Sequence, residues 1–163
     1  AVAALMAAGW VAATPAASAD EDLLPSGSFS MGNIGDDSGQ CYERFQDTDL
    51  VQLEKCDSSK KGQQWTAEKL SDGRFKLHNG AGGCLQWEEE PRQYESRDYR
   101  LRDCAKAAHF EVESAPEGTV WFKETDESES TTYLMVKGGS GHLDRNPLSN
   151  SDLKISQWKI TEL

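Results

Sequence analysis

Four cysteines are the side chains of this sequence with the most clearly defined chemistry. They are Cys41, Cys56, Cys84 and Cys104. An even number of cysteines in an exported chain is typical of disulfides, and four cysteines allow three pairings, between which spacing alone does not choose. No C-x-x-C pair occurs, which argues against a zinc site or a thioredoxin-like redox centre. We therefore expect two disulfides and no metal.

The sequence carries none of the short motifs of common catalytic classes. It has no G-x-S-x-G, no H-E-x-x-H, no Walker loop and no calcium-binding EF-hand loop. The three histidines, His78, His109 and His142, are spread along the chain, and we assign them packing or surface roles. Two acidic runs, at 88–90 and 126–129, are interpreted as solvated loops, with an interaction surface as the alternative. We predict a protein that is not an enzyme and needs no cofactor.

An internal repeat of about forty-five residues must position these side chains. The segment VQLEKC, which ends at Cys56, matches YRLRDC, which ends at Cys104. An aromatic residue follows in each copy, in the sequences QQW, AHF and SQW. These landmarks assign the repeats to about 29–70, 71–115 and 116–163. The third copy has no cysteine.

Each copy begins with a short strand before its first landmark. The strands are FSM at 29–31, RFKL at 74–77 and TVWF at 119–122, and turns rich in Gly, Asp or Pro bound them. Each repeat offers about four short strands, and no amphipathic helix is evident after residue 19. The sequence therefore predicts an all-β fold of about twelve strands, in which three units close around one shared core.

The Q-x-W sequence at Gln63–Trp65, with Cys41 and Cys56 upstream, resembles the repeat of ricin B-type lectins. The resemblance covers 29–163 and implies a β-trefoil, which is a six-stranded barrel capped by three hairpins with pseudo-threefold symmetry. It also implies one disulfide within each of the first two repeats, Cys41–Cys56 and Cys84–Cys104. Repeat one matches best, repeat two has Ala-His-Phe for Q-x-W, and repeat three keeps the tryptophan and the spacing.

The resemblance also implies a sugar site in repeat one. It places the hydroxyl-accepting carboxylate on Glu43 and the polar donors on Gln52 and Gln63. The stacking aromatic of the family falls on Glu54, and its asparagine falls on Gly62. A sugar ring needs both polar partners and an aromatic face, so this site is partly degraded.

The corresponding positions of the other two repeats predict no standard sugar site. They fall on Gln86 and Arg102 in repeat two and on Met135 in repeat three. A non-standard surface is the alternative, and its candidates are Trp87, Tyr94, Asp144 and Asn146. Trp87 either caps the core or stands exposed beside Tyr94. The recurring aromatics Trp65, Phe110 and Trp158 are interpreted as the shared core rather than as sugar platforms.

Charge and the N-terminal region indicate the compartment and exclude some partners. The 163 residues carry 17 basic and 28 acidic side chains, a net charge of −11, which disfavours nucleic acids and anionic membranes. Residues 1–19 are uncharged and end in Ala-Ser-Ala, so we interpret them as the remnant of a signal peptide. Residues 20–28 form an acidic arm, either a disordered tail or a tether that inserts Leu23 and Leu24 into a partner.

These features favour two functions, ahead of a third, an enzyme or a protease inhibitor. The first is a secreted, non-catalytic carbohydrate-binding module. The second is a protein–protein adaptor in a secreted bacterial complex, such as a toxin assembly, with degenerate sugar sites. The partner is thus a glycan or a secreted protein, and the sequence does not indicate an oligomeric state.

Overall fold

Twelve strands form the structure, a computed structural model that describes residues 23–35, 39–88, 98–125, 130–136, 143–148 and 153–163. The first repeat holds β1 (Phe29–Asn33), β2 (Gln40–Arg44), β3 (Val51–Lys55) and β4 (Trp65–Lys69). The second holds β5 (Phe75–Asn79), β6 (Cys84–Trp87), β7 (Tyr99–Arg102) and β8 (Phe110–Ala115). The third holds β9 (Thr119–Thr125), β10 (Thr131–Val136), β11 (Leu143–Asn146) and β12 (Trp158–Glu162).

Helical structure is confined to single turns in the described part of the chain. These are the 3-10 helices η1 (Lys61–Gln63), η2 (Cys104–Lys106) and η3 (Pro116–Gly118). None of the described residues forms a helix long and apolar enough to cross a membrane.

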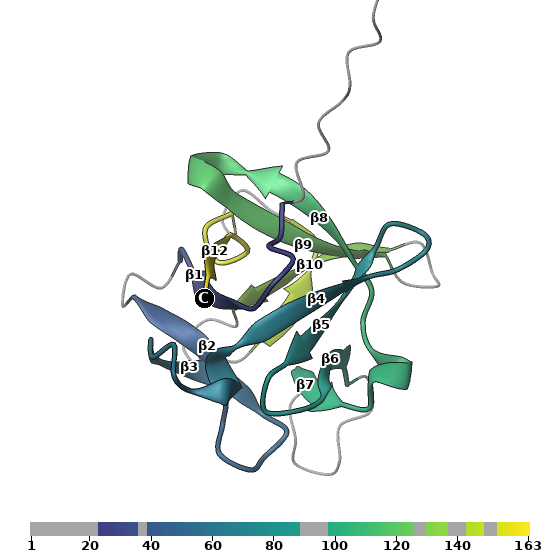
Figure 1. Cartoon of the computed structure of the whole chain (residues 1–163). Helices are drawn as coiled ribbons and strands as arrows, with labels where there is room; N and C mark the ends of the chain where they lie inside the picture. The colour runs from purple at the N-terminus through teal and green to yellow at the C-terminus, as the bar shows by residue number, and fades with distance from the viewer. Residues whose placement is uncertain (1–22, 36–38, 89–97, 126–129, 137–142, 149–152) are drawn as a thin grey trace, which may run out of the picture.

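Six of the strands close into an antiparallel barrel. β1 pairs with β4, β4 with β5, β5 with β8, β8 with β9, β9 with β12, and β12 pairs with β1 again. The first and last strands of the chain therefore lie side by side (Figure 1). Closure matters because a closed barrel leaves no unpaired sheet edge among these strands.

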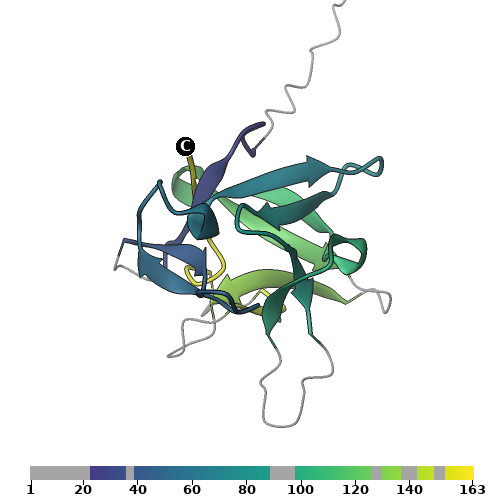
Figure 2. The same ribbon diagram turned by 60° about the horizontal axis from the view of Figure 1, so that its bottom comes forward.

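The other six strands form three hairpins, β2–β3, β6–β7 and β10–β11. Figure 2 shows the hairpins on the side of the barrel opposite the C-terminus. One hairpin per repeat on a six-stranded barrel is the β-trefoil, so the predicted fold class is confirmed.

The recurring aromatics occupy one equivalent position in the barrel. Trp65 pairs with Phe29, Phe110 with Phe75, and Trp158 with Val120. All three recurring side chains are fully buried in one core cluster. Two of these rings meet neighbours edge to face: Trp158 lies 5.0 Å from Tyr42, and Phe110 lies 5.8 Å from Phe122, between ring centroids. Edge-to-face contacts of this kind add to the apolar area that such side chains bury.

The Ala-His-Phe departure in repeat two has a structural explanation. The indole Nε1 of Trp65 donates to the carbonyl of Tyr42 (3.1 Å), and that of Trp158 donates to the carbonyl of Leu134 (2.9 Å). Phe110 has no such donor, and the equivalent carbonyl, Leu85 O, instead accepts from the backbone N–H of Ala108 at 2.8 Å. Because a backbone donor takes the place of the indole, the phenylalanine does not cost repeat two this hydrogen bond.

The acidic arm contributes to the core. Leu24 is buried in the core cluster, whereas Leu23 is exposed. The backbone of Leu163 donates to the carbonyl of Ser28 at 2.9 Å, which ties the end of the arm to the C-terminus. The hypothesis that both leucines insert into a partner is therefore wrong for Leu24. Residues 1–22, which include the predicted signal peptide remnant, lie outside the described residues.

Each disulfide joins two cysteines of the same repeat, as the resemblance implied. Cys41 bonds to Cys56 between β2 and the residue after β3, and Cys84 bonds to Cys104 between β6 and η2. The bonds span 15 and 20 residues of sequence. Loops of that length correspond to about 3 kcal/mol of stabilisation each, through restriction of the unfolded chain.

We expect either disulfide to be dispensable for folding but not for stability. Replacing Cys41 and Cys56 together by alanine, or Cys84 and Cys104 together, should lower the free energy of unfolding by about 3 kcal/mol. Urea unfolding followed by tryptophan fluorescence measures this loss. Repeat three holds its place in the barrel without a disulfide, so each variant should still unfold in one cooperative transition. A variant that lacks a cooperative transition would contradict this expectation.

Candidate functional site

The residues predicted to bind sugar in repeat one lie on the hairpin β2–β3 and on the adjoining turn. Glu43 in β2 lies directly opposite Gln52 in β3. Both side chains are partly buried, and the side chain of Glu43 keeps 15% of its surface exposed. Directly opposed residues on one face of an antiparallel pair are close enough to contact the same small ligand.

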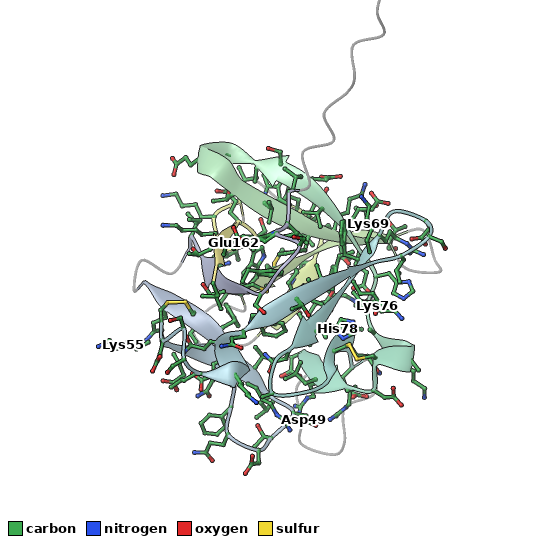
Figure 3. The ribbon with its side chains drawn as sticks, in the orientation of Figure 1. Asp49, Lys55, Lys69, Lys76, His78 and Glu162 are labelled. Carbon is green, nitrogen blue, oxygen red and sulfur yellow. A yellow bond between two sulfur atoms is a disulfide. The ribbon has the colours of Figure 1, made fainter. Side chains whose placement is uncertain are left out.

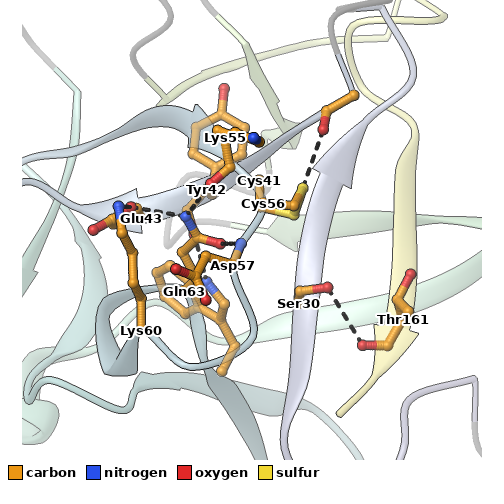
Figure 4. Close-up of a disulfide and its surroundings, with 12 residues drawn as sticks. Ser30, Cys41, Tyr42, Glu43, Lys55, Cys56, Asp57, Lys60, Gln63 and Thr161 are labelled. Atoms are coloured by element: carbon orange, nitrogen blue, oxygen red, sulfur yellow. Dashed lines mark hydrogen bonds and ion pairs between the residues drawn. A yellow bond between two sulfur atoms is a disulfide. The ribbon is translucent and has the colours of Figure 1, made fainter.

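Gln63 has a structural role in this arrangement (Figure 4). Its Nε2 donates to Glu43 Oε2 and to the carbonyl of Lys55, each at 2.8 Å, and its Oε1 accepts from the backbone N–H of Asp57 at 2.7 Å. A glutamine amide has two hydrogens to donate, and here both are engaged. The side chain is also almost fully buried. The amide of Gln63 is thus fully engaged within the protein, where it locks η1 onto the hairpin.

Lys60 is the site residue that the sequence reasoning missed. Its Nζ lies 3.0 Å from Glu43 Oε2, so this one oxygen receives hydrogen bonds from both Lys60 and Gln63. The hydrogen bond to Glu43 raises the pKa of Lys60. Both described bonds fall on Oε2, which leaves Glu43 Oε1 as an acceptor. The only sequence signal for Lys60 was its place in the turn before Q-x-W.

The aromatic face of the site is not where the resemblance would put it. That position is Glu54, whose Oε1 accepts a 2.7 Å hydrogen bond from Gln52 Nε2. Phe45, two residues after Glu43, continues the ladder because its backbone N–H donates to Leu50 O at 2.9 Å. Alternation along the strand then places Phe45 on the same side as Glu43, and its side chain is partly exposed.

The missing asparagine is explained by close packing. A Cβ atom on Gly62 would lie 3.2 Å from Glu43 Cγ and 3.3 Å from the carbonyl oxygen of Arg44. A larger residue there would need its neighbours on β2 to give way by a few tenths of an ångström. The site of repeat one therefore has Glu43 held by Lys60 and Gln63, with Gln52 directly opposite Glu43.

The equivalent surfaces of the other repeats have different chemistry. Gln86 lies opposite Arg100, and Arg102 forms ion pairs with Glu88 (3.1 Å) and with Asp49. Glu88 is therefore paired rather than a free solvated charge, and residues 89 and 90 lie outside the described residues. In repeat three, Met135 stands at the carboxylate position and is buried.

The second predicted surface is only partly assembled. Trp87 packs against the edge of the core and meets Tyr99 edge to face, with 5.3 Å between ring centroids. The guanidinium of Arg145 lies over the Trp87 ring, 4.7 Å from its centroid. A cation in that place occupies one face of the Trp87 ring, so a sugar cannot stack on that face. Tyr94 and His142 lie outside the described residues.

Arg145 belongs to a polar cluster that joins repeats two and three. Its Nη1 lies 3.6 Å from Glu124 Oε2, and the buried hydroxyl of Tyr99 donates to the same oxygen. Burial, followed by the neighbouring Glu124 charge, raises the pKa of Tyr99 well above its ordinary value. Asp144 and Asn146 lie beside Arg145 on β11, where Asn146 Nδ2 donates to Asp144 Oδ2 at 3.3 Å. Among the described residues, the cluster links hairpin β6–β7 to hairpin β10–β11.

Comparison with solved structures finds the same fold in sugar-binding and other proteins. A ricin B-like lectin from Macrolepiota procera in complex with lactose is 13% identical with a TM-score of 0.65, over 85% of this chain and 96% of the lectin. A designed threefold-symmetric protein, ThreeFoil, is 16% identical with a TM-score of 0.60, over 83% and 99%. A Clostridium perfringens endo-β-galactosidase that releases GlcNAcα1-4Gal is 16% identical with a TM-score of 0.56, over 82% of this chain but only 32% of the enzyme.

These likenesses establish the β-trefoil and no more, because the sequence identities are low. No protein-family model and no curated protein matches the chain. This chain spans about a third of the length of the endo-β-galactosidase, so the activity of that enzyme does not transfer with the fold.

Proposed function

We propose that this chain is a secreted, non-catalytic carbohydrate-binding module that holds a glycan on the outer face of the β2–β3 hairpin. The observation that carries the proposal is the carboxylate of Glu43. Gln63 and Lys60 hold it in place through Oε2, and its Oε1 remains to accept from a hydroxyl. A preoriented acceptor costs less ordering on binding than a mobile side chain does.

Donors and an apolar surface stand near that acceptor. Lys60 Nζ has further hydrogens beside the carboxylate, and Gln52 faces Glu43 across the hairpin. Phe45 offers an aromatic ring on the same side of the strand. A lectin of the same fold binds lactose, which supports a glycan as the ligand class. The two disulfides fit an oxidising, extracellular location.

We expect Glu43→Ala to abolish glycan binding without unfolding the protein. A single shallow site with Glu54 in place of the family's aromatic residue should bind a glycan with a dissociation constant of about 1 mM, which is a binding free energy of roughly −4 kcal/mol. The measurement is a glycan array, followed by NMR titration of the wild type and the variant with the glycan that binds. Glu111→Ala is the matched control, because Glu111 also pairs with a lysine (Lys123, 2.8 Å) but lies on β8, outside the hairpin.

The outcomes separate the module from other functions. A glycan that binds the wild type and Glu111→Ala but not Glu43→Ala supports the proposal. A glycan that binds all three proteins equally places the site elsewhere and contradicts the assignment. Far-UV circular dichroism must show that all three proteins are folded at the titration temperature, since Glu43 also anchors Gln63.

A protein–protein adaptor is the second candidate function. It is favoured by the state of the other two repeats, where Arg145 covers Trp87, Met135 is buried and Arg102 is tied to Glu88. In that case no glycan on the array should bind the wild type. A secreted protein should co-purify with the wild type and should bind Glu43→Ala with the same affinity. Release of that protein on charge reversal at residues 89 and 90 would replace the lectin proposal with the adaptor.

A further inference from the structure

A histidine lies against one of the two disulfides. His78 Nδ1 is 3.2 Å from Cys84 Sγ and 3.6 Å from Cys104 Sγ. Figure 3 shows His78 beside this disulfide. The three possible ligand atoms all lie within 4.8 Å of one another. The other disulfide has a backbone neighbour instead, since Cys56 Sγ lies 3.1 Å from the carbonyl oxygen of Gly39.

The second nitrogen of the ring is held by a carboxylate. His78 Nε2 lies 2.8 Å from Glu68 Oε2. An ionised carboxylate can only accept, so Nε2 carries the hydrogen, and the neutral ring then has a lone pair on Nδ1. That lone pair faces two sulfur atoms which, while bonded to each other, have no hydrogen to donate. A histidine whose outer nitrogen donates to a carboxylate is the usual arrangement of a metal-binding imidazole.

Repeat one shows that the fold does not need a side chain at this position. The residue equivalent to His78 is Gly32, since Gly32 pairs with Cys41 as His78 pairs with Cys84. The space beside Cys41–Cys56 is a cavity of about 430 Å³, lined by residues of β1, β2 and β12 and by both cysteines. Ser30 and Thr161, labelled in Figure 4, also line it. The barrel therefore tolerates an open space where repeat two has an imidazole.

We propose that the Cys84–Cys104 disulfide is the closed state of a metal site, which opens on reduction to bind a soft divalent cation of the zinc class through Cys84, Cys104 and His78. A dithiol reductant supplies the two electrons and two protons: its thiolate attacks one sulfur and displaces the other cysteine as a thiolate. Its second thiol then closes to a disulfide and leaves both cysteines reduced. Binding of the cation displaces two protons from the two thiols.

The positions of the three side chains fit this sequence of steps. Cys104 is partly exposed and Cys84 is fully buried, so Cys104 is the sulfur that a reductant can reach. The displaced thiolate is then Cys84, which lies nearer to His78. Two thiolates and one imidazole leave one of the four tetrahedral positions of zinc for water, and the side chain of His78 is 32% exposed on that surface.

Cobalt(II) is a suitable probe, because thiolate ligands give it a charge-transfer absorption and tetrahedral coordination gives visible bands. The full chain, reduced with a phosphine under nitrogen, should bind one Co²⁺ at this site and lose the cobalt spectrum when Zn²⁺ is added. The oxidised chain should show no thiolate–cobalt absorption. His78→Gln, which keeps the polar contact to Glu68, should weaken Co²⁺ binding by about 100-fold or more, and Glu68→Gln by about 10-fold.

Repeat one supplies the matched control. Replacing Cys84 and Cys104 by serine leaves the reduced Cys41 and Cys56 beside Gly32, and this variant should bind Co²⁺ no better than reduced His78→Gln does. Adding Gly32→His to it should create thiolate–cobalt absorption. Near-UV circular dichroism of the buried tryptophans reports whether the reduced chains are folded. The proposal is overturned if the folded, reduced wild type binds no cobalt, if His78→Gln binds it equally well, or if reduction alone unfolds the chain.

Discussion

Trp65→Ala and Trp158→Ala should each lower the free energy of unfolding by about 3–5 kcal/mol, the usual cost of deleting a large buried aromatic side chain. Both rings are fully buried at equivalent barrel positions, and each donates a hydrogen bond from its indole to a hairpin carbonyl. The loss therefore combines a cavity with a broken link between barrel and hairpin. Chemical denaturation followed by far-UV circular dichroism measures it, because each variant removes a fluorescent tryptophan.

Repeat two suggests the control for this experiment. Phe110 fills the same position without an indole, and Ala108 N–H bonds to the carbonyl that would otherwise lose its donor. Trp65→Phe keeps most of the ring volume but removes the donor to Tyr42 O, so it should cost about 1–3 kcal/mol. Phe110→Trp should gain little, since the equivalent carbonyl is already bonded.

A different result would change the interpretation of these residues. If Trp65→Ala melted like the wild type and lost glycan binding, the ring would be a sugar platform and the core assignment would be wrong. If Trp65→Phe were as damaging as Trp65→Ala, the hydrogen bond rather than the buried volume would dominate.

The fold was predictable from sequence because its landmarks repeat. The cysteine pair recurs in repeats one and two, and the aromatics Trp65, Phe110 and Trp158 recur in all three repeats with a nearly constant spacing. That spacing sets the register of strand, hairpin and strand in each repeat. Leu24 was harder to place, because an isolated leucine in a short acidic arm has no periodic pattern to show that it is buried.

The candidate site was less predictable, because it depends on side-chain contacts between separate elements. Glu43 and Gln52 were identified from their offsets to Cys41 and Cys56, and they do face each other. Lys60 reaches Glu43 from the turn before η1, and no spacing rule predicts the direction of a flexible lysine. The position of Arg145 over Trp87 depends on how repeats two and three meet, which a comparison of single repeats does not contain.

Among the charged residues, we expect substitution of Asp98 to lower the free energy of unfolding the most. Its carboxylate is 2% exposed and accepts a 2.9 Å hydrogen bond from Arg100 Nε, and the side chain of Arg100 is 7% exposed. Asp49, from the first hairpin loop, also pairs with Arg100 Nη1 at 3.2 Å, so this cluster joins repeats one and two.

Asp98→Ala should lower the free energy of unfolding by about 3 kcal/mol, because it leaves the buried guanidinium of Arg100 with one fewer partner. This value is near the lower end for breaking a buried ion pair, since Asp49 still pairs with Arg100. Adding Arg100→Met should restore much of the loss, since an apolar side chain no longer needs a carboxylate. The double-mutant cycle, measured by urea unfolding, separates the pair from its surroundings. Asp72→Ala is the control: the Asp72–Arg74 pair (2.7 Å) lies at the surface, so its loss should change stability little. If Asp98→Ala were as mild as Asp72→Ala, the burial of the Asp98–Arg100 pair would not make it more important for stability than a surface pair.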